Sequence, residues 1–211
     1  MRRASRLSAE VLAPYLFQVT DPPTPLDWLS LFGNDHPVEI EIGFGKGLFI
    51  LTSALANSAV NYLGVEIERK LQLFTANRIA KRELHNVRLI KADGRLFLRD
   101  YVKSESVQAV HVYFPDPWWK QRHRKRRLFT SEFADQCIRV LRPGGHLHLA
   151  TDVDEYFEVM AALLAKQERL DRVSLVKSEL PSQESEFQTN FERKSIIQGR
   201  SVNRAVYRRK A

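Results

Sequence analysis

The sequence predicts an α/β fold in which a mainly parallel, doubly wound sheet carries helices on both faces. Three observations lead to this prediction. Short apolar runs typical of strands alternate with stretches whose apolar residues recur at helical spacing. The connections between these elements are short, and a glycine-rich turn follows the first strand-like run. No internal repeat or low-complexity linker divides the chain, so we expect one domain with seven strands.

Four strands and two helices are predicted before residue 115. The first strand is PVEIEIG at 37–43, and the helix after it is indicated by Leu48, Leu51, Thr52, Leu55 and Ala56. The second strand is AVNYLGVEI at 59–67, a helix follows over 69–84, and NVRLIKAD at 86–93 is the third strand. SVQAVHVYF at 106–114 is the fourth strand, and its nearly continuous apolarity predicts burial on both faces.

Two helices and three strands are predicted in the remainder. A helix over 131–141 should end at RPGG, because proline cannot continue a helix and the two glycines allow unusual dihedral angles. HLHLATD at 146–152 is the fifth strand. The next helix is indicated by Tyr156, Val159, Met160, Leu163 and Leu164. RVSLVKS at 172–178 and NRAVYRR at 203–209 are the last two strands.

Composition favours a cytoplasmic domain with an anionic partner. The 211 residues, 44% of them hydrophobic, suffice for one substantial core. Residues 1–37, which include DPPTP, read as an irregular N-terminal arm, and residues 38–211 as the domain. Lysine and arginine outnumber aspartate and glutamate by 33 to 25, so a nucleic acid is the expected partner. No apolar run approaches the ~20 residues of a membrane span and no secretory signal is evident, so we expect no membrane association.

The sequence indicates neither a disulfide nor a metal site. Cys137 is the only cysteine, and it falls at helical spacing with Phe133, Val140 and Leu141, which indicates a core position. The histidines show no metal-ligand spacing with other donors and are interpreted as structural or RNA-facing: His85, His111, His123, His146 and His148. The oligomeric state is left open.

Acidic residues follow five predicted strands at the edge where such sheets bind ligands. They are Glu41, Glu66, Asp93, Asp116 and Asp152, and the turn after Glu41 contains Gly43, Gly45 and Gly47. A dinucleotide fingerprint would need its third glycine at position 48, which is Leu48, and Glu41 would repel a pyrophosphate. S-adenosylmethionine fits better because it is cationic and carries no phosphate. Glu66 could then accept from the ribose hydroxyls and Asp93 from the adenine amino group.

The stretch FPDPWWKQRHRKRR reads as the acceptor side of a methyl transfer. Asp116 should face the methyl group, because the fourth and first strands are neighbours in a doubly wound sheet. Trp118 and Trp119 could stack on a base, although core packing would explain one of them. The cations that follow are expected to contact RNA phosphates: Arg122, Arg124, Lys125, Arg126 and Arg127.

The chain resembles the bacterial tRNA (guanine-N7)-methyltransferases from about Val38 to its end. The motifs EIGFGKG, GVEI, KADG, FPDPWWKQRHRKRR, LRPGG, ATD and TNFE occur in that family's order and spacing. The resemblance implies a Rossmann-like class I methyltransferase fold, with a seven-stranded sheet whose last strand is antiparallel. It also implies S-adenosylmethionine-dependent methylation of guanine N7 at position 46, in the tRNA variable loop.

The resemblance carries site residues over by position. Glu41, Glu66, Asp93 and Asp116 would border the cofactor together with the three glycines of the turn, and Asp116 would be catalytic. Substrate contacts would come from Lys120, Asp152, Thr189, Asn190, Phe191 and Glu192. Where several members have lysine in TKFE this chain has Asn190, so a cationic contact is missing there or supplied elsewhere.

The expected chemistry needs few groups. Guanine N7 already presents a lone pair, so the attack on the methyl carbon requires no prior deprotonation. Our hypothesis is that Asp116 orients guanine by accepting its N1 and N2 hydrogens, with Asp152 and Glu192 as alternatives. Two other readings stay open. One is a methyltransferase of an exocyclic base nitrogen, and the other is a basic RNA-binding protein without catalysis.

Overall fold

One sheet of eight strands forms the centre of the described chain. The structure is a computed structural model that describes residues 7–118, 121–178 and 189–211. The strands are Leu16–Phe17 (β1), Val38–Ile42 (β2), Asn61–Glu66 (β3), Val87–Lys91 (β4), Val107–Tyr113 (β5), Leu141–Thr151 (β6), Leu170–Ser178 (β7) and Val202–Arg209 (β8).

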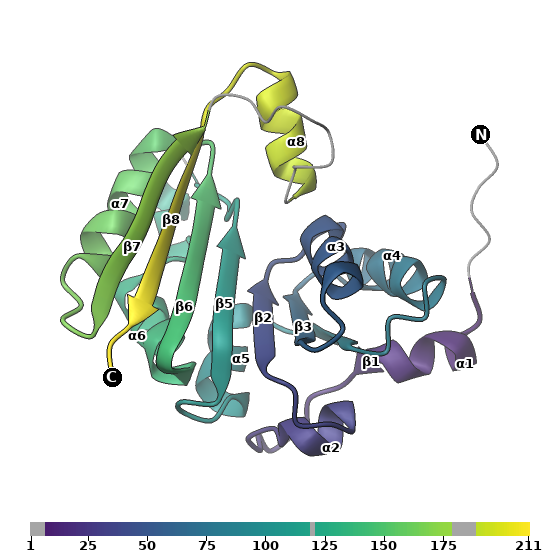
Figure 1. Ribbon diagram of the computed structural model, residues 1–211. Coiled ribbons are helices and arrows are strands. Elements are labelled where there is room, and N and C mark those ends of the chain that lie inside the picture. Colours follow the sequence, from purple (N-terminus) through teal and green to yellow (C-terminus); the bar gives the residue numbers. More distant parts are fainter. Residues whose placement is uncertain (1–6, 119–120, 179–188) are drawn as a thin grey trace.

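The strands lie in the order β1-β4-β3-β2-β5-β6-β8-β7 (Figure 1). Neighbours from β1 to β6 pair in parallel, whereas β8 pairs antiparallel with both β6 and β7. The predicted fold class and the antiparallel last strand are therefore confirmed. The pairing of β2 with β5 also confirms that the first and fourth predicted strands are neighbours.

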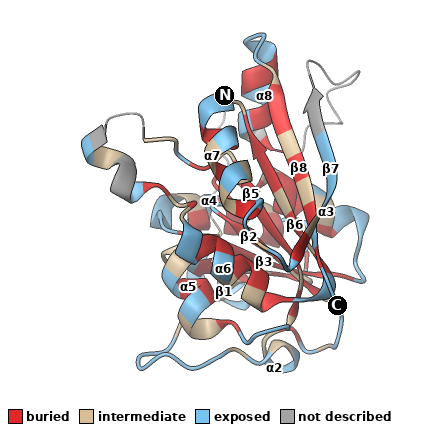
Figure 2. Ribbon diagram, turned by 90° about the vertical axis from the view of Figure 1, so that its left-hand side faces the viewer, coloured by how far each residue is buried: buried red, intermediate tan, exposed pale blue. Residues whose placement is uncertain are grey.

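Helices cover both faces of the sheet. They are Ala9–Leu12 (α1), Trp28–Phe32 (α2), Leu48–Ala56 (α3), Arg69–Ala80 (α4), Gly94–Tyr101 (α5), Ser131–Val140 (α6), Asp154–Leu164 (α7) and Asn190–Ile197 (α8), with 3-10 turns at Ala13–Tyr15 (η1) and Gln121–Arg126 (η2). One core lies between the sheet and α5, α6 and α7, and a second packs α1, α3 and α4 on the other face. Figure 2 shows buried residues concentrated along the central strands.

The alternation of side chains along β2 places its acidic residues. Val38, Ile40 and Ile42 point into the core beneath α5 to α7. Successive side chains of a strand point to opposite faces, so Glu39 and Glu41 face the other side. The burial of Glu41 and the partial burial of Glu39 therefore follow from the strand pattern, and both carboxylates need compensating partners on that face.

The N-terminal arm is more ordered than its sequence suggested. Leu16 pairs with Leu89 and Phe17 with Ile90, which adds β1 to the edge of the sheet and raises the predicted seven strands to eight. Leu12 and Tyr15 are buried in the core under α3 and α4. The sequence does not predict β1, because a strand of two residues is too short to show an alternation of apolar and polar residues.

The RPGG segment belongs to a strand rather than to a loop. The helix α6 ends at Val140 and β6 begins at Leu141, five residues before the predicted strand start. Leu141 pairs with Val107, and the register then shifts before Ala109 pairs with His146. A β-bulge absorbs the extra residues, and the glycines allow it.

Candidate active site at the carboxyl ends of the central strands

The predicted acidic residues form a row along one edge of the sheet. Because β4, β3, β2, β5 and β6 are consecutive and parallel, their carboxyl ends lie side by side. The residues that end or follow these strands are, in that order, Asp93, Glu66, Glu41, Asp116 and Asp152. The N-terminus of α8 lies over the same edge (Figure 1).

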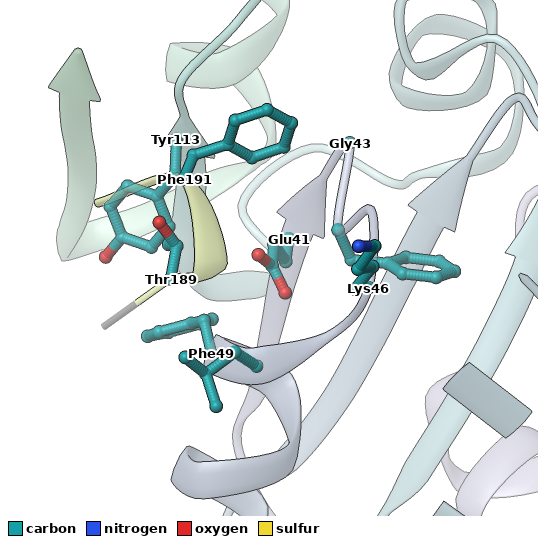
Figure 3. A pocket seen from close by; sticks show the side chains of 9 residues that line it. Glu41, Gly43, Lys46, Phe49, Tyr113, Thr189 and Phe191 are labelled. Carbon is teal, nitrogen blue, oxygen red and sulfur yellow. The ribbon is translucent and has the colours of Figure 1, made fainter. Parts of the chain in front are cut away.

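Two adjacent hollows open at this edge. The glycine-turn pocket is lined by Glu41, Gly43, Phe44, Lys46, Leu48, Phe49, Tyr113, Thr189 and Phe191 (Figure 3). The PDP-loop cavity, of about 340 Å³, is lined by Phe114, Pro115, Asp116, Pro117, Thr151, Asp152, Val153, Phe191, Lys194, Ser195, Gln198 and Arg200. Phe191 is common to both, so the two hollows meet at the start of α8.

The glycine-rich turn needs its glycines. Gly43, Gly45 and Gly47 all have positive φ, and a Cβ at Gly47 would lie 2.3 Å from the Thr75 side chain. The turn is tied to the next strand because the Gly45 amide donates to Glu66 Oε2 at 2.9 Å. A backbone without side chains at these points can approach a ligand closely.

Glu41 is a buried carboxyl group at the floor of the glycine-turn pocket. It is 4% exposed, and its Oε2 has no hydrogen-bond partner in the described part of the chain. Burial, and then the nearby charge of Glu66, raise the pKa of Glu41 to about 8, although a backbone hydrogen bond from Ile50 opposes this. A cationic group in the pocket would supply the missing partner and favour the ionised form. The site therefore fits the positively charged end of S-adenosylmethionine.

Glu66 and Asp93 lie further along the row and line neither hollow. The second oxygen of Glu66 accepts from the Glu68 amide at 3.0 Å, so this carboxylate already holds two loops. Asp93 caps α5 by accepting from the Arg95 amide, and it forms a 2.7 Å ion pair with the Arg95 guanidinium. Hydrogen bonds from Arg95 keep the pKa of Asp93 below its usual value.

Asp116 and Asp152 face the PDP-loop cavity under different restraints. Asp116 is exposed and makes no hydrogen bond or ion pair with the described residues. Asp152 Oδ2 accepts from the Ser195 hydroxyl at 2.7 Å and from Arg200 at 3.2 Å. Both carboxylates can accept further hydrogen bonds from a ligand, and Asp116 has more of its lone pairs available.

The residues of the TNFE segment have two kinds of role: some stabilise α8, and Phe191 lines the PDP-loop cavity. The Thr189 hydroxyl caps α8 by accepting from the Glu192 amide at 3.0 Å. Glu192 is 1% exposed and forms an ion pair with Arg204 of β8, so its carboxylate does not line the cavity. Glu192 is therefore no longer a candidate for holding the guanine edge. Asn190 begins α8, but its side chain lies outside the described atoms.

The basic segment after the PDP loop is not uniform. Arg122 and Arg126 are exposed, and Arg126 stacks over the Trp118 ring at 5.2 Å, while the His123 ring packs against that indole. The backbone of Arg124 and Lys125 lies in η2. The side chains of these two residues, together with Trp119 and Lys120, fall outside the described part of the structure.

The expectation for Arg127 needs correction. Its side chain is buried, with 8% of the residue exposed. Its Nε donates to the Pro117 carbonyl at 2.7 Å, and its guanidinium lies over the Tyr156 ring at 4.9 Å. Arg127 therefore braces the PDP loop from below, and a phosphate contact does not fit this position.

A buried polar chain supports the floor of the glycine-turn pocket. His111 Nδ1 lies 3.0 Å from the Tyr113 hydroxyl and His111 Nε2 lies 2.9 Å from Glu39. The His148 ring stacks on His111 at 4.6 Å, and burial lowers the pKa of His148 to about 3. These histidines are structural, as one of the two sequence readings had it. These polar contacts could not be predicted because Glu39, His111 and His148 are distant from one another in the sequence.

Among the described residues, no group of three or more histidine, cysteine or acidic side chains is arranged to hold a metal ion. None of the described helices is both long and apolar enough to span a membrane.

The chain is similar to known methyltransferases in sequence and fold. Residues 35–205 match a family model described as a putative methyltransferase. A tRNA (guanine-N(7)-)-methyltransferase of Rhodopirellula baltica is 41% identical over 197 residues, which cover 90% of this chain and 73% of the relative. The enzyme of that name from Alkalilimnicola ehrlichii is 35% identical, covering 100% of this chain and 91% of the relative.

Solved structures show the same fold at low sequence identity. The 16S rRNA methyltransferase KamB superposes with a TM-score of 0.65 at 16% identity, covering 92% of this chain and 95% of that chain. An antibiotic-related methyltransferase gives a TM-score of 0.62 at 14% identity, covering 88% and 96%. Because the family model spans residues 35–205 and these relatives match 90% or more of this chain and 73% or more of their own length, the chain belongs to the tRNA (guanine-N7)-methyltransferase family.

Proposed function

We propose that this protein transfers the methyl group of S-adenosylmethionine to N7 of a guanine in tRNA. The observation that carries the proposal is buried Glu41, whose Oε2 has no hydrogen-bond partner among the described residues, beside the glycine turn and next to the cavity that Asp116 faces. A buried carboxylate oxygen without a partner is costly unless a ligand supplies one. The relatives that bear this activity in their names support the same reading.

The cofactor residues are Glu41, the three glycines of the turn, Glu66, Asp93 and Asp116. When bound, S-adenosylmethionine supplies an electrophilic methyl group on a positively charged sulfur. Glu41 provides the negative charge in the pocket that receives the cation, and the turn of Gly45 and Gly47 allows close approach of the backbone. Glu66 and Asp93 keep free lone pairs at the ends of β3 and β4 for the nucleoside part.

Asp116 is proposed as the residue that orients the guanine. N7 carries a lone pair, so no side chain has to remove a proton before the attack. Positioning of the reacting atoms can supply roughly 7–11 kcal/mol of the barrier reduction. The exposed Asp116 carboxylate can accept the N1 and N2 hydrogens of guanine, which adenine does not offer. Asp152, anchored by Ser195, is a second acceptor on the same cavity.

The tRNA contacts are proposed to extend from the cavity over the basic surface. Lys194 and Arg200 line the cavity, and Arg122 and Arg126 are exposed on η2. We place the target guanine at position 46 of the variable loop, and the reaction in the cytoplasm, as the family resemblance implies.

The test is the identity of the product. The protein is incubated with an unmodified tRNA transcript and S-adenosylmethionine, and the nucleosides of the digested RNA are identified by mass spectrometry. We expect 7-methylguanosine as the product. N2-methylguanosine or N6-methyladenosine would identify a methyltransferase of an exocyclic nitrogen, and RNA binding without any methylation would identify a non-catalytic protein.

A further inference from the structure

Two phenylalanine rings face each other across the junction of the two hollows. The rings of Phe114 and Phe191 are nearly parallel, with centroids 6.2 Å apart and an interplanar angle of 19°. Both rings line the PDP-loop cavity. Phe191 is 57% exposed, so its ring is accessible to a ligand in the cavity.

The backbone holds both rings in place. Phe114 has φ of 51°, and its amide donates to the Ala150 carbonyl at 2.7 Å. A left-handed conformation at a bulky residue is strained, and such strain gathers at functional sites. Phe191 lies in the first turn of α8, which is fixed by the Thr189 cap and by the bond from Ser195 to Asp152.

Phe191 also borders the pocket assigned to the methyl donor. Its Cε2 lies 3.7 Å from the position of a Cβ at Gly45, and the residue lines the glycine-turn pocket. Figure 3 shows Phe191 beside Tyr113, with its ring extending toward the glycine turn. A base that contacts the ring of Phe191 in the cavity therefore lies next to the donor pocket.

Trp118 is less suited to this role. One face of its indole is covered by Arg126 and its edge is packed by His123. A base would have to displace these contacts before it could stack there. Among the described aromatic residues, Phe114 and Phe191 are the ones that line the PDP-loop cavity.

We propose that Phe114 and Phe191 form an aromatic clamp that opens from its 6.2 Å ring separation to admit the target guanine, holds the base by its faces and stabilises the charge it acquires. This inference rests on the proposed function and assigns the residues that bind the base. In the reaction the N7 lone pair forms the new bond to the methyl carbon, the electron pair of the broken bond stays on sulfur, and no proton moves. Positive charge passes to the imidazole part of guanine, where the electron-rich faces of phenyl rings favour it. Because this attraction grows as the charge develops, the clamp favours the transition state over the bound substrate.

The test uses 7-methylguanosine, the charged product, as an NMR probe that requires no catalysis. Stacking on phenyl rings shifts the N7-methyl and H8 proton signals upfield. We expect this shift with the unaltered protein, and tighter binding of 7-methylguanosine than of guanosine. Phe191→Leu and Phe114→Leu should each lose at least half of the shift and most of that preference.

Two further variants make the result specific. Phe191→Tyr keeps an aromatic face and should recover the shift. Phe74→Leu is the matched control, because Phe74 is 49% exposed on α4 and lines neither hollow, so its shift should equal that of the unaltered protein. No upfield shift with the unaltered protein, or an unchanged shift in both leucine variants of the clamp, would overturn the clamp.

Methylation kinetics provide the second measurement. Stacking contributions reported for single bases correspond to roughly tenfold or more in affinity. We expect the single-turnover rate to fall at least tenfold in Phe191→Leu and to recover most of the loss in Phe191→Tyr. A leucine variant that methylates within twofold of the unaltered protein contradicts the clamp. Failure of the unaltered protein to form 7-methylguanosine contradicts instead the proposed function, while the NMR titration still decides the clamp.

Discussion

The hydroxyl of Ser195 donates a 2.7 Å hydrogen bond to Oδ2 of Asp152, and this contact joins α8 to the end of β6. Ser195 is 5% exposed and the Asp152 side chain 15%, so the bond is shielded from water. It ties the wall that carries Phe191 to the end of β6, the strand that pairs with β5 and therefore lies beside the loop that carries Asp116. The shape of the PDP-loop cavity therefore depends on a contact between residues 43 positions apart.

Ser195→Ala is expected to impair use of tRNA more than binding of the cofactor. A hydrogen bond to a charged group contributes about 1.5–3 kcal/mol, so kcat/KM for tRNA should fall by roughly tenfold or more. The affinity for S-adenosylmethionine should change little, because Ser195 does not line the glycine-turn pocket. Ser106→Ala removes an exposed hydroxyl bonded to the Lys103 carbonyl and is the matched control. Equal kcat/KM in the two variants would contradict this role of Ser195.

Glu41 should make both stability and cofactor binding depend on pH. Burial raises its pKa to about 8 in the folded protein, above the ordinary value of 4.5, so the folded state holds this proton more tightly than the unfolded one. The contribution of Glu41 to stability is therefore complete below about pH 4.5 and is lost as pH rises toward 8. Glu41→Gln, which cannot ionise, should lose less stability over this interval, by up to a few kcal/mol at roughly 1.4 kcal/mol per pKa unit.

Binding of the cationic cofactor has the opposite dependence, because it requires the ionised carboxylate. Affinity should rise between about pH 6 and 8, with release of up to one proton per cofactor at neutral pH. Calorimetry in buffers of different ionisation enthalpy measures that release. The same proton release from Glu41→Gln as from the unaltered protein would show that another group titrates.

Asp116→Ala is expected to reduce the single-turnover rate of methylation by roughly a hundredfold, with the methylated product unchanged. The reason is loss of guanine orientation, since positioning is the main catalytic contribution available at N7. Asp100→Ala, which removes a partly exposed acid paired with Arg99 on α5, is the control and should leave the rate unaltered. A normal rate from Asp116→Ala would move the assignment to Asp152.

Affinity for tRNA should fall steeply as salt is added. Each phosphate contact contributes about 0.7–0.9 to the slope of log affinity against log salt concentration. Arg122→Ala should therefore reduce the steepness of that slope by the contribution of one contact. Lys103→Ala changes an exposed cation just before β5, at the opposite edge of the sheet, and should leave the slope unchanged. Equal slopes for the two variants would place the tRNA elsewhere on the surface.

Local patterns predicted the part of the site that depends on strand ends. Glu41, Asp116 and Asp152 could be placed on one edge because each follows a strand and parallel strands end together. The helix α8 could also have been predicted, since Thr189 and Glu192 stand at the spacing of a capping box. Likewise Asp93 is a recognisable N-cap for α5, which the apolar period alone did not reveal.

Contacts between side chains of distant segments could not be predicted from the sequence. The sequence makes Glu192 a candidate ligand for guanine, but the structure pairs it with Arg204. The sequence also predicts a phosphate contact for Arg127, whose guanidinium instead donates to the Pro117 carbonyl. The tryptophans beside the basic run predict that a base stacks on Trp118, but in the structure Arg126 covers the Trp118 ring. The pairing of Phe114 with Phe191 arises only when α8 folds back over β5.

The most direct test of the account compares two tRNA transcripts, one with guanine and one with adenine at position 46. After incubation with the protein and S-adenosylmethionine, borohydride and aniline cleave the RNA chain at 7-methylguanosine. The account predicts a single cut at position 46 in the first transcript and none in the second. Absence of cleavage in the first, or equal cleavage at other guanines in both, would contradict it.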